Sequence, residues 1–502
     1  MMKRIFSVAF VGLAALSLIA SPALHAAEPD QEVLNNIDQT FARWQQDSHV
    51  PGLVYGIVMD GRLIVVKGQG IQDVVAKRPV NPDTLFRIAS MSKAFTALAI
   101  LKLRDEGKLS LDAPAETYVP EMRGWVYPTK DSRKIRVRDL LNHIAGLVTD
   151  DPWGDRQQPL TEPEFTAILK AGIPFSRPAG SAMEYSNFGY ATLGRIISNV
   201  SGQRYQDYIR DRFLAPLGMA STTYDIHKSP LDRRAIGYRW QDSAWVREPD
   251  MADGVFGAMG GIETSANDYT RWVAFLLSAW PPRNNAESGP VSRATVREIV
   301  EGSNFPEGAE RASTAGPPCR AARAYGMGWI VMDDCDLGRM VTHSGGYPGY
   351  GSRVLLLPDK GIGIFAFASR TYAAPSVPVL KAALALVATR HFPDRAAATS
   401  EGVTKGYKLA QAIWVAGTVS NAKSGLAMNF LMDRDALHWQ RELTRLKAAV
   451  GTCPATEPVL AQTAMEGKFS WTCEHGRIEG KFLLAPTNDV ALQTLNFDAV
   501  GP

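Results

Sequence analysis

Two residues three positions apart, Ser90 and Lys93, could provide a nucleophile and the base that activates it. Side chains at positions i and i+3 of a helix lie on one face, so these two would be neighbours. Apolar residues follow Lys93 and would bury it, and burial lowers a lysine pKa toward the range where the amine accepts a proton. At a helix start, free backbone N–H groups would also stabilise a developing oxyanion. The pair therefore predicts acyl transfer through a serine.

The Ser-x-x-Lys spacing also arises by chance, so its meaning depends on the sequence around it. Ser420 and Lys423 repeat it without supporting motifs, and we expect a solvated helix face there. Two motifs follow Ser90 in order: Tyr-Ser-Asn at 185–187, just before a predicted helix, and His-Ser-Gly-Gly at 343–346, on a predicted strand.

In this order the motifs resemble the signature of class C β-lactamases, DD-peptidases and their esterase relatives, within the serine β-lactamase and penicillin-binding-protein superfamily. Further segments that resemble landmarks of this superfamily are 86–95, 140–147, 260–265 and 325–329. The resemblance extends over residues 30–392.

The resemblance implies a role for each motif residue. Ser90 would attack a carbonyl carbon and form an acyl-enzyme. Lys93 and Tyr185 would share general acid–base catalysis, and Asn187 would hold Lys93 and the substrate amide by hydrogen bonds. His343 would occupy the place of the cation in the third motif. The alternatives are structural roles: Tyr185 would be a buried tyrosine with a hydrogen-bonded hydroxyl, and His343 would only shape its strand.

The resemblance also implies an oxyanion hole and a substrate pocket. The backbone N–H groups of Ser90 and Gly346 would form the oxyanion hole. We expect His143 to be a structural hydrogen-bonding residue near a helix end. The residues expected to line the substrate pocket are Ser344, Gly345, Trp153 and Tyr347.

The third motif bears most on the substrate. Class C β-lactamases have lysine where this chain has His343, and histidine is mostly neutral above its ordinary pKa of about 6.5. Histidine here resembles the DD-carboxypeptidase, D-aminopeptidase and esterase branches. We therefore expect hydrolysis of D-amino-acid peptides or short esters, with β-lactamase activity as the alternative. A penicillin-binding or sensor protein that acylates without turnover is the alternative from another class.

The sequence lacks the motifs of an α/β-hydrolase and of a metal-dependent enzyme. The Gly-x-Ser-x-Gly motif of an α/β-hydrolase does not occur, because Thr342 stands two residues before Ser344. No His-Glu-x-x-His or other metal-ligand spacing is present, so we expect no metal and no cofactor. The four cysteines form two local pairs, Cys319 with Cys335 and Cys453 with Cys473, which predict disulfides, or else free buried thiols.

The elements that must position these residues follow from periodicity. Apolar residues recur at helical spacing from Leu34 to Trp44, and helices are predicted at 90–106, 191–200 and 205–214. Strands are predicted at 53–59 and 63–66 around an Asp-Gly turn, and at 325–332, 353–357 and 362–368. Strands at both ends and helices between them predict an α+β fold: an antiparallel sheet flanked by helices, with a helical subdomain.

Composition changes divide the chain further. We predict a catalytic domain at 27–393, a linker at 394–403 and a small α+β domain at 404–502. In the last we expect a helix from Ala436 to Val450 and strands around Trp471 and Leu483. Phe469 and Trp471 are expected to form a small core rather than a binding patch.

The N-terminal residues predict export. Lys3 and Arg4, an apolar run and small residues up to Ala26 have the layout of a signal peptide at 1–26, which predicts a periplasmic protein. A membrane anchor is the alternative, but the run is short and Pro22 follows it. Without Lys3 and Arg4 the formal net charge falls from +3 to about +1, which favours neither nucleic acid nor an anionic membrane as partner. The expected partner is a small-molecule or peptide substrate, for example one derived from the cell wall.

Overall fold

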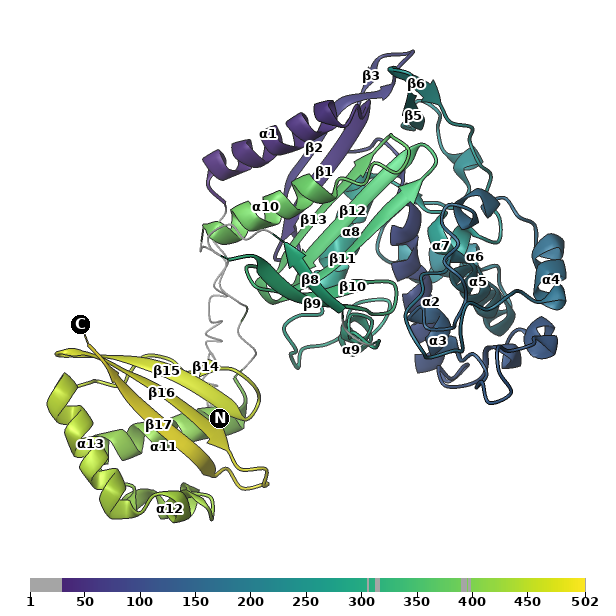
Figure 1. The fold of residues 1–502 in the computed structure, drawn as a ribbon. Coiled ribbons are helices and arrows are strands. Elements are labelled where there is room, and N and C mark those ends of the chain that lie inside the picture. Colours follow the sequence, from purple (N-terminus) through teal and green to yellow (C-terminus); the bar gives the residue numbers. More distant parts are fainter. Residues whose placement is uncertain (1–28, 305–306, 312–316, 390–394, 396–398, 502) are drawn as a thin grey trace, which may run out of the picture.

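A nine-stranded antiparallel sheet forms the centre of the larger domain in a computed structural model of the chain (Figure 1). The structure describes residues 29–304, 307–311, 317–389, 395 and 399–501. The strand order is β3-β2-β1-β13-β12-β11-β10-β9-β8, so that β1 pairs with β13 and the prediction of a sheet built from both ends is confirmed. The strands are β1 (Gly52–Met59), β2 (Arg62–Asp73), β3 (Arg78–Pro79), β8 (Glu307–Arg311), β9 (Cys319–Tyr325), β10 (Ile330–Asp334), β11 (Gly338–Tyr347), β12 (Tyr350–Leu357) and β13 (Ile362–Ala368).

Two turns of this sheet follow directly from their residues. β1 and β2 are joined by Asp60 and Gly61, at φ 49° and 77°, as an Asp-Gly hairpin requires. β12 and β13 are joined by a turn of 3-10 helix, Pro358–Lys360, and by Gly361 at φ 68°. Both hairpins were expected from the sequence.

One predicted strand, 325–332, is two strands in the structure. β9 ends at Tyr325 and β10 begins at Ile330. Between them Gly328 has a φ of 79°, and a Cβ at this position would lie 2.9 Å from the carbonyl oxygen of Lys93. The glycine therefore permits both the chain reversal and its close approach to the nucleophile segment.

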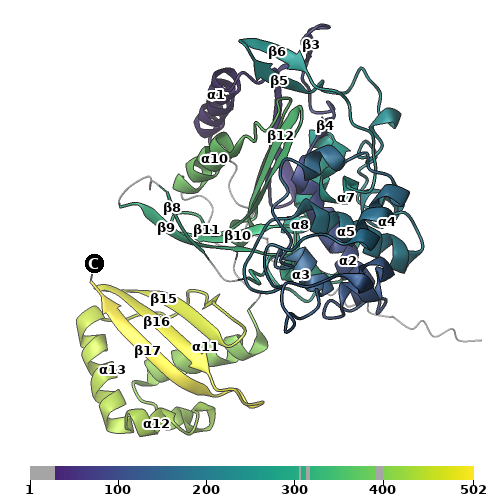
Figure 2. The same ribbon diagram turned by 45° about the vertical axis from the view of Figure 1, so that its right-hand side comes forward.

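Helices cover both faces of the sheet (Figure 2). α1 (Gln31–Asp47) and α10 (Ser376–Ala388) pack together on one face, where Ile37 and Phe41 join a core with strand residues. α8 (Ala266–Leu277) contacts β1 and β13 on the other face. The helical region beside it contains α2 (Lys93–Asp105), α3 (Val137–Leu141), α4 (Glu162–Ala171), α5 (Asn187–Ser201), α6 (Tyr205–Ile209), α7 (Gly257–Gly260) and α9 (Arg293–Glu298). Two short strand pairs are β4 (Phe86–Arg87) with β7 (Glu263–Thr264), and β5 (Tyr238–Gln241) with β6 (Ala244–Arg247).

The segment that contains Ser90 differs from the predicted helix. A turn of 3-10 helix covers Ala89–Ser92, and α2 begins only at Lys93. Ala89 is held at φ 48°, in the left-handed region, because the chain bends sharply between β4 and the helix. The end of the helix is as predicted, with Gly107 at φ 71° just after it.

The C-terminal domain has a hydrophobic core of its own. Figure 1 shows its four-stranded sheet backed by α11 (Glu401–Ala416) and α13 (Ala436–Val450), with α12 (Phe430–Asp433) between them in sequence. The sheet order is β14 (Leu460–Ala461), β15 (Glu466–Cys473), β16 (Gly476–Leu484) and β17 (Leu492–Val500). Phe469 and Trp471 stack at 4.3 Å inside this core, as expected, whereas β17 was not predicted.

Two predictions concern segments that are described in part or not at all. The predicted signal peptide, 1–26, lies outside the described residues. The predicted linker, 394–403, is partly described, and α11 already begins at Glu401 because Ser400 Oγ accepts the Val403 N–H and caps the helix. Among the described residues, no helix is both long and apolar enough to cross a membrane.

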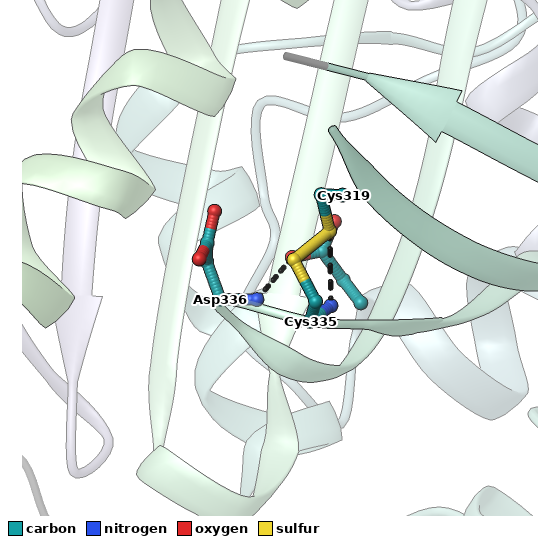
Figure 3. Close-up of side chains that lie close together, drawn as sticks. Cys319, Cys335 and Asp336 are labelled. Atoms are coloured by element: carbon teal, nitrogen blue, oxygen red, sulfur yellow. Dashed lines mark hydrogen bonds between the residues drawn. A yellow bond between two sulfur atoms is a disulfide. The ribbon is translucent and has the colours of Figure 1, made fainter. Parts of the chain in front are cut away.

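Both predicted cysteine pairs are disulfides. Cys319, at the start of β9, is bonded to Cys335, just after β10 (Figure 3). Cys453, after α13, is bonded to Cys473 at the end of β15. The alternative of free buried thiols was therefore wrong. Each bond joins two neighbouring segments of one domain.

Candidate active site

Ser90 opens into a cavity of about 690 Å³ at the junction of the sheet and the helical region. The side chain is only 7% exposed. Four of the predicted site residues line the same cavity: Tyr185, His343, Ser344 and Gly346. The other lining residues are Thr149, Asp151, Asp155, Arg177, Met183, Glu184, Arg323, Tyr325, Ile330 and Tyr372. Three motifs that lie far apart in the sequence therefore meet at one opening.

Lys93 is fully buried and directs its amine at Ser90. Its Nζ donates to Ser90 Oγ at 3.0 Å, to Asn187 Oδ1 at 2.8 Å and to the Met259 carbonyl oxygen at 2.9 Å. Burial lowers the pKa of Lys93 to about 8, and nearby carboxylates, first that of Asp151, offset part of this effect. A lysine with this pKa can take up a proton near neutral pH.

Asn187 is fixed at the start of α5 by a pair of aspartates. The carboxylate of Asp150 accepts the backbone N–H groups of Asn187 at 2.6 Å and Phe188 at 2.8 Å. The Asn187 side-chain amide donates to Asp151 Oδ1. The Asp150 carboxylate satisfies donors that a helix N-terminus leaves free. Asp151 holds the side-chain amide so that Asn187 Oδ1 faces Lys93. Sequence reasoning did not identify either aspartate.

Tyr185 stands beside Ser90 and Lys93 as a neutral phenol. The Lys93 Nζ lies 4.8 Å from the centre of its ring. Burial raises the pKa of Tyr185 well above its ordinary value, although a hydrogen bond with Ser90 acts in the opposite direction. In the resting site this hydroxyl therefore carries a proton that it can donate.

His143 supports the tyrosine, as its predicted structural role requires. Its Nδ1 accepts the Ser186 N–H at 3.1 Å, and its ring lies 4.3 Å from that of Tyr185. The backbone of His143 is in the left-handed region, at φ 57°. Burial also lowers the pKa of His143 well below its ordinary value, so it is neutral.

His343 occupies the third-motif position but carries no charge. Its Nδ1 is 2.6 Å from the Ser344 carbonyl oxygen, which can only accept, so Nδ1 holds the proton. Nε2 is then free to accept the Tyr325 hydroxyl at 3.0 Å. Burial, with the nearby Lys93 charge, lowers the pKa of His343 to about 3. The third-motif position therefore holds a neutral imidazole.

The two glycines after Ser344 have different surroundings. A Cβ on Gly345 would collide with the Ile88 carbonyl oxygen and with Ser352 Oγ, so this glycine lets β11 approach the nucleophile segment closely. Gly346 lines the cavity and pairs with Gly351 of β12. Gly345 is therefore a packing residue, not a pocket residue as predicted.

Two further predicted pocket residues also lie elsewhere. Trp153 is 50% exposed and packs edge-on against Phe256, at 6.1 Å between ring centres. Tyr347 is buried beneath the Arg87 guanidinium, 4.6 Å from the centre of its ring. Neither lines the cavity, because Trp153 turns outward and the side chain of Tyr347 turns into the core.

Sequence reasoning also missed polar residues on the walls of the cavity. Burial raises the pKa of Asp155 to about 7, and its carboxylate accepts the Tyr372 hydroxyl at 3.0 Å. Tyr325 was noted only within a landmark segment. The acidic run from Asp150 to Asp155 was a visible signal, but nothing in the pattern places it beside Lys93.

One group of residues outside the cavity has a ligand-like composition. Potential ligand atoms of Cys319, Asp334, Cys335 and Asp336 lie within 4.8 Å of one another. However, both sulfur atoms belong to the disulfide, which leaves no thiolate (Figure 3). The carboxylates of Asp334 and Asp336 both bind Arg311, at 2.6 and 2.9 Å. The chemistry of this group does not suit a metal ion.

The chain is similar in sequence to known proteins. The family described as Beta-lactamase matches residues 37–389. Protein flp of Staphylococcus aureus (strain MRSA252) is 32% identical over 337 residues, which cover 66% of this chain and 62% of the relative's length. Penicillin-binding protein 4* of Bacillus subtilis (strain 168) is 27% identical over 308 residues, covering 58% of this chain and 62% of the relative.

Solved structures share the fold. The octameric penicillin-binding protein homologue from Pyrococcus abyssi has a TM-score of 0.56 at 22% identity, covering 90% of this chain and 96% of its own. A mutant of a class C β-lactamase has a TM-score of 0.57 at 22% identity, covering 73% of this chain and 99% of its own.

Proposed function

The chain belongs to the β-lactamase family, and on this premise we propose that it is a metal-independent serine hydrolase that acts through an acyl-serine intermediate. The observation that carries the proposal is the position of Lys93. A buried amine with a lowered pKa touches both the proposed nucleophile, Ser90 Oγ, and Asn187. A lysine with a purely structural role would not be expected to contact a serine that lines a cavity.

In the proposed acylation, Ser90 Oγ attacks the substrate carbonyl carbon while its proton passes to Lys93 Nζ. The backbone N–H groups of Ser90 and Gly346 receive the oxyanion. When the tetrahedral intermediate collapses, the bond to the leaving group breaks and that group takes a proton from the Tyr185 hydroxyl. Water then attacks the acyl-serine and gives a proton to the Tyr185 oxygen. When this second tetrahedral intermediate collapses, its bond to Ser90 Oγ breaks and Oγ takes a proton back from Lys93 Nζ.

For the substrate, we propose an amide or ester of a D-amino-acid peptide or of a short acyl group. Carboxypeptidase, aminopeptidase and esterase reactions share this chemistry. The neutral His343 favours these over β-lactams, because it offers no fixed charge to the carboxylate of a β-lactam at that position. β-Lactamase activity and acylation without turnover are the competing proposals.

We propose that the protein is exported to the periplasm. We also propose that it acts on a small-molecule or peptide substrate, for example one derived from the cell wall, and has no nucleic acid partner. The two disulfides favour an oxidising compartment. The leader-like residues 1–26 favour export in the same way.

The proposal is tested with the purified mature protein, a fluorescent penicillin and a short-chain nitrophenyl ester, each beside Ser90→Ala. We expect ester turnover that requires Ser90, with weak or transient penicillin labelling. Stable labelling of Ser90 without turnover would indicate a penicillin-binding or sensor protein instead. Unchanged turnover in Ser90→Ala would show that the proposed function is wrong.

A further inference from the structure

The two proposed oxyanion-hole donors belong to segments that are far apart in the sequence. The Ser90 N–H is on the short turn after β4, and the Gly346 N–H is on β11. An oxyanion hole stabilises the transition state only when both donors lie about 3 Å from the developing oxyanion. The contacts that fix the distance between these two segments therefore affect the rate of the proposed reaction.

The turn that carries Ser90 is strained and depends on its surroundings. Ala89, the residue before the nucleophile, is in the left-handed region at φ 48°, which costs free energy for a residue with a Cβ. Such a conformation persists only where neighbouring groups fix it. Ser352 Oγ of β12 donates to the Ile88 carbonyl oxygen at 2.7 Å. Gly345 of β11 leaves room for the Ala89 side chain.

A third contact joins the same two segments through a cation and an aromatic ring. Arg87 lies three residues before Ser90. Tyr347 directly follows Gly346, and the centre of its ring is 4.6 Å from the guanidinium carbon of Arg87. Both side chains are buried. The negative face of the ring attracts the guanidinium, and this attraction is stronger where water is excluded. The stack therefore ties the nucleophile segment to the end of β11.

Arg87 has few other partners, although it is almost fully buried. Its Nη1 donates to the Met251 carbonyl oxygen at 2.8 Å, whereas Nε and Nη2 have no hydrogen-bond partner among the described residues. Glu263 stands opposite Arg87 in the pairing of β4 with β7, but its carboxylate binds Arg234 at 3.1 Å. The Tyr347 ring is therefore a principal contact of this guanidinium.

Tyr347 lacks a polar partner in the same way. Its hydroxyl is buried and has no hydrogen-bond partner within the described part of the chain. A pair of apolar side chains would fill this space without burying a charge or leaving polar atoms unsatisfied, and both of those cost folding free energy. The stack with Arg87 is thus unfavourable for stability, which is typical of a geometry that serves the reaction rather than the fold.

We propose that Arg87 and Tyr347 are positioning residues whose stack sets the distance between the two oxyanion-hole N–H groups. The inference rests on the proposed serine hydrolase function. Neither side chain lines the cavity, so both act through the backbone segments that they join. Loss of the stack should weaken binding of the transition state more than binding of the substrate.

The test compares nitrophenyl esters with the corresponding thionoesters, in which sulfur replaces the carbonyl oxygen. Sulfur is larger and accepts hydrogen bonds more weakly, so a thionoester gains less from the oxyanion hole. In Arg87→Met and in Tyr347→Leu we expect kcat for the ester to fall by about tenfold to a hundredfold, with little change in KM. The ester-to-thionoester ratio of kcat/KM should fall by about tenfold in both variants.

Conservative variants separate the stack from other effects. Tyr347→Phe keeps the ring and should lose less of the ratio than Tyr347→Leu. Arg87→Lys keeps the charge but not the planar group, so its ratio should lie between those of the wild type and Arg87→Met. Arg434→Met is the matched control, because the Arg434 guanidinium lies 4.9 Å from the ring centre of Trp439 in the C-terminal domain. This control should keep the wild-type ratio.

The ratio decides between a positioning role and a structural role. A wild-type ratio in both Arg87→Met and Tyr347→Leu would overturn the proposal, whether or not the overall rate falls. Lower stability in denaturant unfolding with an unchanged ratio would assign the stack to the fold alone. If Arg87→Met does not fold, Arg87→Lys and the two Tyr347 variants decide the question. Turnover of the ester by Ser90→Ala would instead show that the proposed function is wrong.

Discussion

The Nζ of Lys93 lies 3.0 Å from the Oγ of Ser90, and the two residues belong to different kinds of helix. Ser90 is in a 3-10 turn, whereas Lys93 is the first residue of α2. The serine therefore stands at the cavity while the lysine is enclosed by aromatic rings, and this difference in exposure gives them different chemical roles.

Lys93→Ala should reduce the acylation rate by about three orders of magnitude or more, because it removes the proposed proton acceptor. Single-turnover acylation by a nitrophenyl ester measures this step directly. Lys408→Ala, on the surface of the C-terminal domain, is a control for the loss of one lysine. Acylation at more than a tenth of the wild-type rate would assign the base to another group.

The pH dependence of kcat/KM should follow the ionisation of the Lys93 amine. This amine accepts a proton only when it is unprotonated, so the rate should rise with pH and level off above about 8. His143 and His343 are neutral throughout this range, so neither should add a step near pH 6.5. Asp155→Asn removes a carboxylate that raises the pKa of Lys93, so the rise should move to lower pH.

Asp489→Asn, an exposed residue of the C-terminal domain, should leave this profile in place. A rise that moves upward in Asp155→Asn would contradict the electrostatic relation between Asp155 and Lys93.

Tyr185→Phe should lower kcat by about a hundredfold, since the hydroxyl is protonated and is the proposed acid for the leaving group. The rise near pH 8 should remain, because it belongs to Lys93. Separate measurement of acylation and deacylation by rapid mixing shows whether both steps lose rate. A near-normal rate would leave the acid–base work to Lys93 alone.

Asp150→Ala should lower the free energy of unfolding by about 1–3 kcal/mol, because two backbone N–H groups of α5 lose their acceptor. Activity should fall as well, since Asn187 would no longer be held against Lys93. Denaturant unfolding and ester turnover measure the two effects. Asp435→Ala removes the cap of α13 in the C-terminal domain, and it should affect stability without affecting turnover.

The double variant Cys319→Ser with Cys335→Ser should lower the stability of the catalytic domain by about 3 kcal/mol, the cost expected for a loop of this length. Cys453→Ser with Cys473→Ser is the matched pair, and its effect should be confined to the C-terminal domain. Hydrogen exchange resolves the two domains. Equal loss of protection in both domains after either change would contradict this assignment.

The sequence was most informative where chemistry or a turn constrains residue types. Ser90, Lys93, Tyr185 and Asn187 were predicted together because their motifs resemble those of a known superfamily, and they lie together. The Asp-Gly hairpin and both disulfides were predicted from short local segments, which few other arrangements satisfy.

Predictions failed where long-range packing decides the outcome. Trp153 and Tyr347 were assigned to the pocket from their position in the chain, but their side-chain directions depend on Phe256 and Arg87.

The pairing of β1 with β13 also affects how the chain is made. Val54 is synthesised more than three hundred residues before its partner, Phe367. Until then β1 has one open edge, and such an edge can pair with other chains and aggregate. Contacts between such distant residues also slow folding, so the sheet of the catalytic domain is expected to remain incomplete until β13 has been synthesised. A chaperone that shields the β1–β2 hairpin during that interval would meet this need.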